Sequence, residues 1–231
     1  MTTPKSGGMT RRRFLGTAAS VGAAGTVVGV ASPAIAQAKP TVLKWAHVYE
    51  VSEPYHTEAL WAAEEIKKRT NGKYEIQVFP ASQLGNEPQI NEALGLGTVD
   101  IIYTGAAFVG GVHRPLSISN CPYIFRNFDH WKAYRGSKLF RELADGYEKK
   151  AGHRIVALTY YGERHMTSNK ELKSPDDMKG MKLRVPQAPL YVLFAKIYSA
   201  NATPIAFAEF YLALQQGTVD GQENPLPTIL A

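Results

Sequence analysis

Residues 93–103 read ALGLGTVDIIY, and the fold class is best inferred from these eleven residues. Its first letters end a segment with helical spacing, Gly97 follows, and VDIIY (99–103) is an apolar run of strand length. Glycine readily adopts the left-handed conformation that ends many helices. The stretch therefore predicts a helix over 87–96, a glycine cap and a buried strand. Such junctions are typical of a mostly parallel sheet covered by helices.

The same junction occurs again near the other end of the chain, where residues 213–220 read ALQQGTVD. The two copies share the pattern A-L-x-x-G-T-V-D and lie 120 positions apart. This separation is too long for stacked repeats, whose periods are about 20–50 residues. Two interpretations remain open. Either the copies mark equivalent corners of two similar lobes, or any helix–glycine–strand junction converges on similar letters.

The segments before residue 103 alternate between strand and helix patterns. TVLKWAHV (41–48) and KYEIQVF (73–79) are typical of strands, and residues 55–69 between them have helical spacing. Together with the helix and strand at 87–103, the order is strand, helix, strand, helix, strand. This order indicates a mostly parallel sheet with helices on its faces.

The second half of the chain repeats the alternation. We predict strands over 154–159, 182–185 and 202–205 and the start of another at 218–220, with helices over 174–179, 189–199 and 207–216. The matching order of elements favours two α/β lobes, and we place lobe 1 at 37–160 and lobe 2 at 161–231.

The first 36 residues have the organisation of an export signal. TRRRFLG (10–16) precedes a weakly apolar stretch rich in glycine and alanine, and PAIA (33–36) is a small-x-small cleavage site. The paired arginines resemble a twin-arginine signal. A membrane span usually needs about 20 strongly apolar residues. We therefore expect residues 1–36 to be a twin-arginine-type signal peptide and the protein to be periplasmic, with an uncleaved N-terminal anchor as the alternative.

The charge of the chain argues against a nucleic-acid partner. The 231 residues include 26 lysines and arginines and 20 acidic residues, which gives a net charge of +6. Four of these cations lie in the leader, so 22 remain against 20 acidic residues and the rest of the chain carries +2. Phosphate binding needs a clustered basic face, and no dense basic run follows residue 40. We therefore expect no nucleic-acid partner.

The sequence contains no recognised catalytic signature. A nucleophile elbow, a P-loop and an H-E-x-x-H motif are all missing. Cys121 is the one cysteine, and the six histidines lack the spacing of metal ligands. The Asp176-Asp177 pair suits the first turn of a helix better than acid–base catalysis. We therefore expect no enzyme, no cofactor and no metal.

Two arginines are the main candidates for ligand binding. Arg184, in MKLRVPQAP, lies in a predicted strand, and Arg164 lies in YYGERHMTSN. Two interpretations of Arg184 remain open, a structural salt bridge and a clamp that holds a ligand carboxylate with two parallel hydrogen bonds. Ligands of α/β lobes sit in crevices at the strand ends. GQENP (221–225), which we interpret as a polar turn after the last strand, offers an amide to the same crevice.

Two long stretches carry a resemblance to a known family. SPDDMKGMKLRVPQAPLY (174–191) and ANATPIAFAEFYLALQQGTVDGQENP (200–225) strongly resemble the substrate-binding proteins of tripartite ATP-independent periplasmic (TRAP) transporters, the DctP-like family. FPASQLGNE (79–87), NCPYIFRNFDH (120–130) and GERHMTSNK (162–170) support the resemblance. The likeness runs from about residue 42 to the C-terminus.

The resemblance implies a two-lobed periplasmic binding protein-like fold with a ligand cleft between the lobes. It also implies a receptor that closes on a small organic acid and delivers it to the membrane subunits of a TRAP transporter. Arg184 would pair with the ligand carboxylate, Arg164 would assist, and Asn224 would hydrogen-bond the ligand. We expect this receptor to be a monomer.

The chain departs from the family pattern in two places. Sialic-acid-type members carry a glutamate where we align Gly105, so the resemblance does not favour sialic acid. Family members also continue well beyond QENP, so we expect the chain to be truncated at Ala231 and lobe 2 to be incomplete. Two other functions remain open, a periplasmic enzyme acting on sugar acids and a membrane-anchored interaction module. The acid itself remains open among four-carbon dicarboxylates, 2-oxo acids, uronates and aromatic acids.

Overall fold

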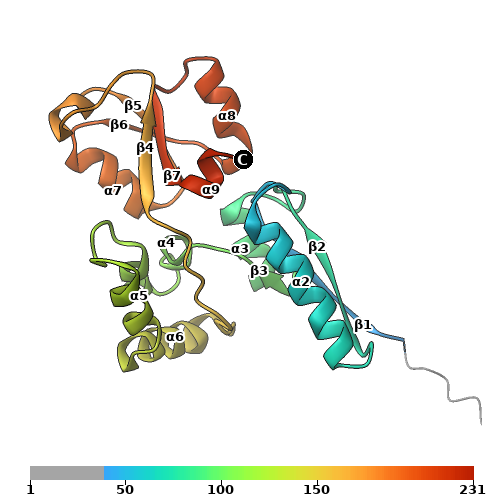
Figure 1. Ribbon diagram of the computed structural model, residues 1–231. Helices are drawn as coiled ribbons and strands as arrows, with labels where there is room; N and C mark the ends of the chain where they lie inside the picture. Colours follow the sequence, from blue (N-terminus) through green and yellow to red (C-terminus); the bar gives the residue numbers. More distant parts are fainter. Residues whose placement is uncertain (1–38) are drawn as a thin grey trace, which may run out of the picture. The chain divides into compact units, whose positions relative to one another are not determined.

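The structure is a computed structural model that describes residues 39–231. The predicted signal peptide, residues 1–36, lies outside the described residues. The described part contains a three-stranded sheet and a four-stranded sheet, each with helices packed against it (Figure 1). Within residues 39–231, no helix is both long enough and apolar enough to span a bilayer.

The first sheet is entirely parallel and has the strand order β2-β1-β3. Its strands are β1 (Thr41–Ala46), β2 (Tyr74–Phe79) and β3 (Ile101–Ile102), and the helices between them are α2 (Pro54–Arg69) and α3 (Glu87–Gly95). In Figure 1, α2 runs alongside β1 and β2. The predicted order of strands and helices is confirmed, although β3 is shorter than the predicted strand at 99–103.

The start of α3 is fixed by its own side chains. The Oδ1 of Asn86 accepts a hydrogen bond from the backbone N–H of Gln89 at 3.0 Å, and the Oε1 of Gln89 accepts one from the N–H of Asn86 at 2.9 Å. This capping box satisfies two backbone donors that the first helical turn leaves free. It also fixes the position of Glu87, the first residue of the helix.

The two A-L-x-x-G-T-V-D stretches form the same corner. Gly97 and Gly217 have φ angles of +70° and +67°, as a left-handed cap requires. The carboxylate of Asp100 accepts a hydrogen bond from the backbone N–H of Lys44, and that of Asp220 accepts one from Lys182, each at 2.8 Å. Lys44 and Lys182 lie in equivalent strands, β1 and β5 (Lys182–Val185). The repeat therefore marks one structural junction used twice, as the first interpretation predicts.

A group of short helices follows the first sheet. These are α4 (Ala106–Val109), the 3₁₀ helix η1 (Arg114–Asn120), α5 (Phe128–Arg135) and α6 (Lys138–Ala151). They bury a common core of Val109, Leu116, Phe140 and Tyr147. None of these helices is predicted from the sequence.

The strand predicted over 154–159 is wrong. Residues 153–163 have no regular secondary structure in the protein. Ile155 and Leu158 pack against the core of the short helices, while Val156 is 85% exposed. The apolar letters therefore pack against helices, and their backbone has no neighbouring strand to pair with.

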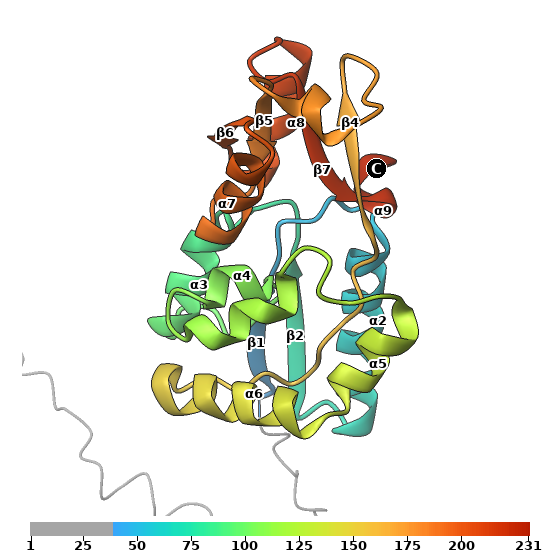
Figure 2. The same ribbon diagram turned by 90° about the vertical axis from the view of Figure 1, so that its left-hand side faces the viewer.

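The second sheet has the strand order β4-β7-β5-β6. Its strands are β4 (Arg164–Ser168), β5, β6 (Asn201–Pro204) and β7 (Gly221–Pro225), and its helices are η2 (Pro175–Met178), α7 (Pro189–Ile197), α8 (Phe207–Gln215) and α9 (Leu226–Ile229). Strand β7 lies between β4, to which it is antiparallel, and β5, to which it is parallel (Figure 2). The predicted strands at 182–185 and 202–205 and the helices at 189–199 and 207–216 are confirmed within three residues.

Two details of the predicted second half are wrong. GQENP (221–225) is not a turn but the buried strand β7 itself. The strand also begins at Gly221 and not at 218–220, because Asp220 is held at the corner by its bonds to Lys182. A polar segment forms this central strand because its side chains bond to those of β4, as described below.

Candidate ligand-binding site

Arg184 lies on β5 and is almost completely buried. Its side chain is 1% exposed, and Nε and Nη2 both donate to the backbone carbonyl of Ile205, at 3.0 and 2.8 Å. The ring of Phe210 lies 4.8 Å from the guanidinium carbon. The remaining nitrogen, Nη1, is buried without any hydrogen-bond partner in the described part of the chain. One edge of this guanidinium therefore has a hydrogen-bond acceptor inside the protein. The other edge is buried but has no acceptor.

The electrostatics of Arg184 show the same imbalance. Burial lowers the pKa of Arg184 to about 10, although the carboxylates of Glu87 and Glu223 act in the opposite direction. Among residues 39–231 it forms no salt bridge, so the interpretation of Arg184 as one half of a structural ion pair is wrong. A buried cation without an anion is costly. The arrangement therefore suits an anion supplied from outside the chain.

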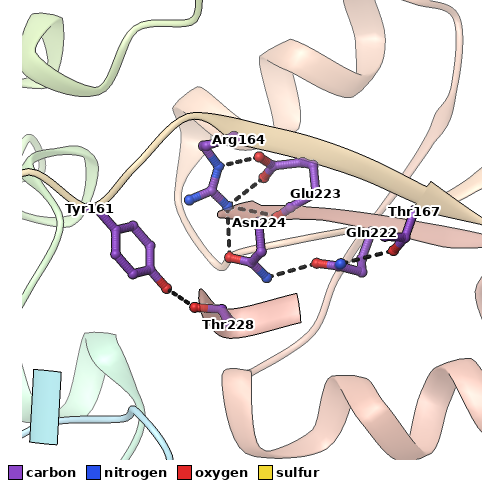
Figure 3. Close-up of polar contacts among 7 residues, drawn as sticks. All are labelled: Tyr161, Arg164, Thr167, Gln222, Glu223, Asn224 and Thr228. Carbon is purple, nitrogen blue, oxygen red and sulfur yellow. Dashed lines mark hydrogen bonds and ion pairs between the residues drawn. The ribbon is translucent and has the colours of Figure 1, made fainter. Parts of the chain in front are cut away.

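Arg164 lies on β4 and is paired within the protein. Its Nη2 donates to the Glu223 carboxylate at 2.9 Å and to the Glu223 carbonyl at 2.8 Å, and Nε donates to the second carboxylate oxygen (Figure 3). The same Nη2 lies 3.0 Å from the Oδ1 of Asn224. The nearby Glu223 carboxylate raises the pKa of Arg164 against the opposing effect of burial. Most of the charge of Arg164 is therefore already neutralised.

A line of amides continues from Arg164 along β7. Asn224 Nδ2 donates to Gln222 Oε1 at 2.7 Å, and Gln222 Nε2 donates to Thr167 Oγ1 at 2.9 Å (Figure 3). Each amide nitrogen carries two hydrogens, so Asn224 retains one donor beyond its bond to Gln222. In the sheet, Gln222 is paired with Arg184 across β7 and β5. The three site residues predicted from the sequence, Arg164, Arg184 and Asn224, therefore lie on adjacent strands.

Two tyrosines and a glutamate lie near this group, and none of them is assigned to the site from the sequence alone. Tyr191 lies with its ring 5.3 Å from the guanidinium carbon of Arg164, and burial raises the pKa of its hydroxyl. Burial also raises the pKa of Tyr49, and Glu87, Tyr161 and Tyr191 raise it further. Glu87 and Tyr191 both lie within the stretches that carry the family resemblance, which is the signal that points to them.

A second polar network lies beside this group. Glu53 is fully buried and accepts a hydrogen bond from Thr228 Oγ1 at 2.7 Å. The hydroxyl of Tyr161 lies 2.7 Å from the same Thr228 oxygen (Figure 3), and its carbonyl accepts from Tyr55 at 2.7 Å. Burial raises the pKa of Glu53. Both carboxylate oxygens of Glu53 accept hydrogen bonds inside the protein, one from Thr228 and one from the backbone N–H of Glu50. This network therefore has a structural role.

Two hollows occur elsewhere on the described part. One, of about 560 Å³, lies along α7 and includes Val192 and Leu193, and the other, of about 390 Å³, is lined by tyrosines that include Tyr55 and Tyr103. Neither wall contains Arg164, Arg184 or Asn224. We place the candidate site at the arginines because Arg184, within the part of the chain that the structure describes, is a buried cation without an ion-pair partner. Among residues 39–231, no cluster of three or more His, Cys, Asp or Glu side chains is able to hold a metal ion.

Comparison with known families gives a clear match. The family described as bacterial extracellular solute-binding protein, family 7 (DctP), matches residues 45–231. A solute-binding protein of Roseobacter denitrificans is 33% identical over 207 residues, which cover 90% of this chain and 63% of the relative. The chain thus spans less than two thirds of that relative's length.

Solved structures agree with this match. A TRAP periplasmic solute-binding protein of Polaromonas with bound D-erythronate is 34% identical with a TM-score of 0.77, over 82% of this chain and 63% of that one. One of Sulfurospirillum deleyianum with bound succinate is 34% identical with a TM-score of 0.74, over 81% of this chain and 61% of that one. The predicted two-lobed α/β fold is confirmed, while the lobe boundary at residues 160 and 161 stays a prediction.

Proposed function

This chain belongs to family 7 of the bacterial extracellular solute-binding proteins, and we propose that it is a receptor for a small organic acid. We also propose that the receptor acts in the periplasm and delivers the acid to the membrane subunits of a TRAP transporter. The observation that carries the proposal is that one edge of the Arg184 guanidinium has no hydrogen-bond acceptor. The residue is 1% exposed, and its Nη1 has no partner in the described part of the chain.

The geometry of Arg184 suits a carboxylate. Its Nε and Nη2 are held by the Ile205 carbonyl, which fixes the guanidinium plane. The free edge presents one hydrogen of Nη1 and the second hydrogen of Nη2. A planar carboxylate accepts two parallel hydrogen bonds from such an edge. The ligand would therefore supply the negative charge that the protein does not place beside Arg184.

Arg164 and Asn224 have supporting roles in this proposal. Glu223 fixes the orientation of Arg164, so Arg164 contributes hydrogen bonds to the ligand with little net charge. Asn224 would donate its second amide hydrogen to the ligand. This division of roles differs from a clamp made of two equivalent arginines.

The remaining parts of the proposal concern organisation. We propose that residues 1–36 are a twin-arginine-type signal peptide, that residues 37–160 and 161–231 belong to two lobes, and that the receptor is a monomer. The family is described as one of solute-binding proteins, and the sequence carries no recognised catalytic motif. We therefore favour a receptor over an enzyme that acts on sugar acids.

A thermal melt of the full chain, purified from the periplasm, tests the proposal. A panel of small carboxylic acids is compared with the matching amides. A ligand at 100 times its Kd stabilises the native state by about 2.7 kcal/mol, which is readily measured. We expect at least one acid to raise the Tm while its amide does not, and mass spectrometry to recover that acid unchanged. Equal shifts by acid and amide, or conversion of the acid, would contradict the proposal.

A further inference from the structure

The parallel sheet brings three loops to one edge. Tyr49 follows β1, Glu87 begins the helix after β2, and Gly105 follows β3. The carboxyl ends of parallel strands meet at the same edge of a sheet, and this is where α/β proteins bind ligands. Tyr49 and Glu87 act on each other electrostatically, which agrees with this placement.

Short contacts connect this edge with the two arginines. A Cβ atom at Gly105 would lie 3.7 Å from the Tyr191 hydroxyl, and the Tyr191 ring lies 5.3 Å from Arg164. On the other side, the ring of Tyr49 lies 6.0 Å from that of Phe207, which lies 5.4 Å from Phe210, the ring beneath Arg184. Ile90, one helical turn after Glu87, packs in the same core as these three rings. The start of α3 therefore lies near Arg184, which agrees with the electrostatic effect of Glu87 and Arg184 on each other.

Glu87 is a buried acid without a cation of its own. It is 9% exposed, and its carboxylate forms no salt bridge and no hydrogen bond to another residue within residues 39–231. The capping box holds the backbone at Glu87, and the Glu87 carbonyl accepts from Asn91 Nδ2 at 2.7 Å. The same Asn91 nitrogen donates to Thr104 at 2.8 Å, which ties the helix to the loop after β3. The carboxylate is thus held in place while its oxygens remain available.

The charges of the site divide into one matched pair and two unmatched groups. Arg164 is neutralised by Glu223, whereas Arg184 and Glu87 act on each other electrostatically but form no ion pair within residues 39–231. A ligand with one carboxylate would satisfy Arg184. A second carboxylate at the other end would face Glu87, and like charges in a buried site repel strongly. Glu87 instead needs hydrogen-bond donors, because a buried acceptor without a donor is costly.

The phenol groups of Tyr49 and Tyr191 also suit the hydroxyl groups of a ligand. Neither the Tyr49 hydroxyl nor the Tyr191 hydroxyl forms a hydrogen bond with another described residue. A phenol both donates and accepts, so it matches an alcohol. A single ammonium group would use Glu87 but leave the donor capacity of both phenols unused.

We propose that Glu87 is a specificity-determining residue that accepts hydrogen bonds from ligand hydroxyl groups, so that the site selects hydroxylated monocarboxylic acids over dicarboxylic acids. Tyr49 and Tyr191 complete the hydroxyl-binding end, and Arg184 forms the carboxylate-binding end. This inference rests on the proposed function, because it assumes that the acid carboxylate binds Arg184.

Titration calorimetry on the full chain, with and without Glu87→Gln, tests the inference. The probes are aldonates of four to six carbons, the dicarboxylates of the same lengths, unsubstituted monocarboxylates and amino acids. We expect the wild type to bind at least one aldonate at least tenfold more tightly than the matching dicarboxylate and monocarboxylate. Glu87→Gln removes the charge with little change in shape, and we expect it to reduce that preference over the dicarboxylate by tenfold or more.

Two controls separate the inference from a general effect on folding. Glu92→Gln changes an exposed acid on the same helix and is expected to leave the preference unchanged. A melt without ligand checks that Glu87→Gln folds, and Glu87→Ala, which also removes the charge, replaces it if the glutamine variant does not. A preference that Glu87→Gln leaves unchanged, or tightest binding of an amino acid, would overturn this inference and leave the receptor function standing. Binding of no acid by the wild type would overturn both.

Discussion

Arg164 and Glu223 lie 59 residues apart in the sequence and form a doubly hydrogen-bonded ion pair across the neighbouring strands β4 and β7. The Glu223 side chain is only 7% exposed and that of Arg164 is 25% exposed. The pair joins the edge strand of the sheet to the strand that carries Gln222 and Asn224. Its electrostatic consequence is that Arg184 is left as the unmatched cation of the site.

Removing one partner of this pair is expected to destabilise the fold. Glu223→Ala leaves Arg164 without its anion, and breaking a buried pair in this way costs about 3–5 kcal/mol. Because Arg164 is partly exposed to water, we expect a value at the lower end of that range. Urea unfolding measures it. Glu65→Ala, which breaks surface pairs with Lys68 and Arg69 on α2, is the matched control, and we expect it to lose much less stability than Glu223→Ala. Equal losses in both variants would contradict the structural role of Glu223.

Replacing Arg184 by lysine is expected to weaken binding of every acid. An ammonium group cannot reproduce two parallel hydrogen bonds to a carboxylate. Truncating a buried charged partner costs about 2–5 kcal/mol of binding, and we expect Arg184→Ala to fall in this range. Calorimetry against the acid that binds best gives the value. Arg154→Ala removes an exposed arginine and should bind like the wild type. Affinity of Arg184→Ala within tenfold of wild type would exclude the carboxylate role.

The same position is expected to separate stability from function. Arg184→Met removes an unmatched buried cation, and replacing buried charges by apolar groups of similar volume is often neutral or stabilising. We therefore expect the ligand-free Arg184→Met variant to melt at or above the wild-type Tm while it loses acid binding. A large drop in its Tm would show that the two bonds to Ile205 matter more for folding than the burial of the charge costs.

Stability is expected to fall at mildly acidic pH because of His47. Burial, and to a smaller extent the neighbouring His56, lowers the pKa of His47 from 6.5 to about 4. The unfolded chain therefore binds a proton here at a higher pH than the folded chain does. The contribution of neutral His47 is fully present above pH 6.5 and is lost as the pH falls towards 4.

A series of melts between pH 7 and pH 4 measures this effect. His47→Gln should reduce the dependence of the free energy of unfolding on pH over this window. His165→Gln, at an exposed position on β4, should not. If His47→Gln and the wild type lose stability in parallel, His47 is not the group responsible.

The close approach of β7 to β4 is expected to exclude any side chain at Gly221. A Cβ atom there would lie far inside contact distance of the Thr167 carbonyl oxygen, which belongs to the backbone and cannot rotate away. We expect Gly221→Ala to cost about 1–3 kcal/mol of stability and to weaken acid binding, because β7 carries Gln222 and Asn224. In Gly111→Ala the new atom meets its nearest neighbour at 3.6 Å, so this control should behave like the wild type. Wild-type stability of Gly221→Ala would contradict the tight pairing of the two strands.

Much of the fold could be predicted because its signals are local. The A-L-x-x-G-T-V-D corners combine a helix end, a glycine with positive φ and an aspartate that bonds the next strand, all within eight residues. The strand predicted at 154–159 fails because apolar spacing does not say whether a sheet or a group of helices will receive the side chains. GQENP fails as a turn because the partners of its polar side chains, Arg164 and Thr167, lie more than 50 residues away.

The candidate site could be predicted only in part. Arg184, Arg164 and Asn224 are found on adjacent strands, although the sequence predicts a turn at Asn224. The sequence alone does not reveal that Arg164 is already neutralised, because nothing in its spacing from Glu223 marks the pair. Glu87 is missed for a related reason. An acidic residue at the start of a helix is normally explained by the helix dipole, and its burial depends on the fold around it.

The place of β7 in the second sheet has a consequence for the order of folding. This strand is made after β4, β5 and β6, yet β4 and β5 meet only through it. Contacts between segments far apart in the chain are slow to form, because a large loop must close first. β5 and β6 pair directly, but the ribosome must complete β7 before β4 is able to join them. The strand that positions Gln222 and Asn224 is also the one that closes the sheet, so an early folding intermediate would have no binding site.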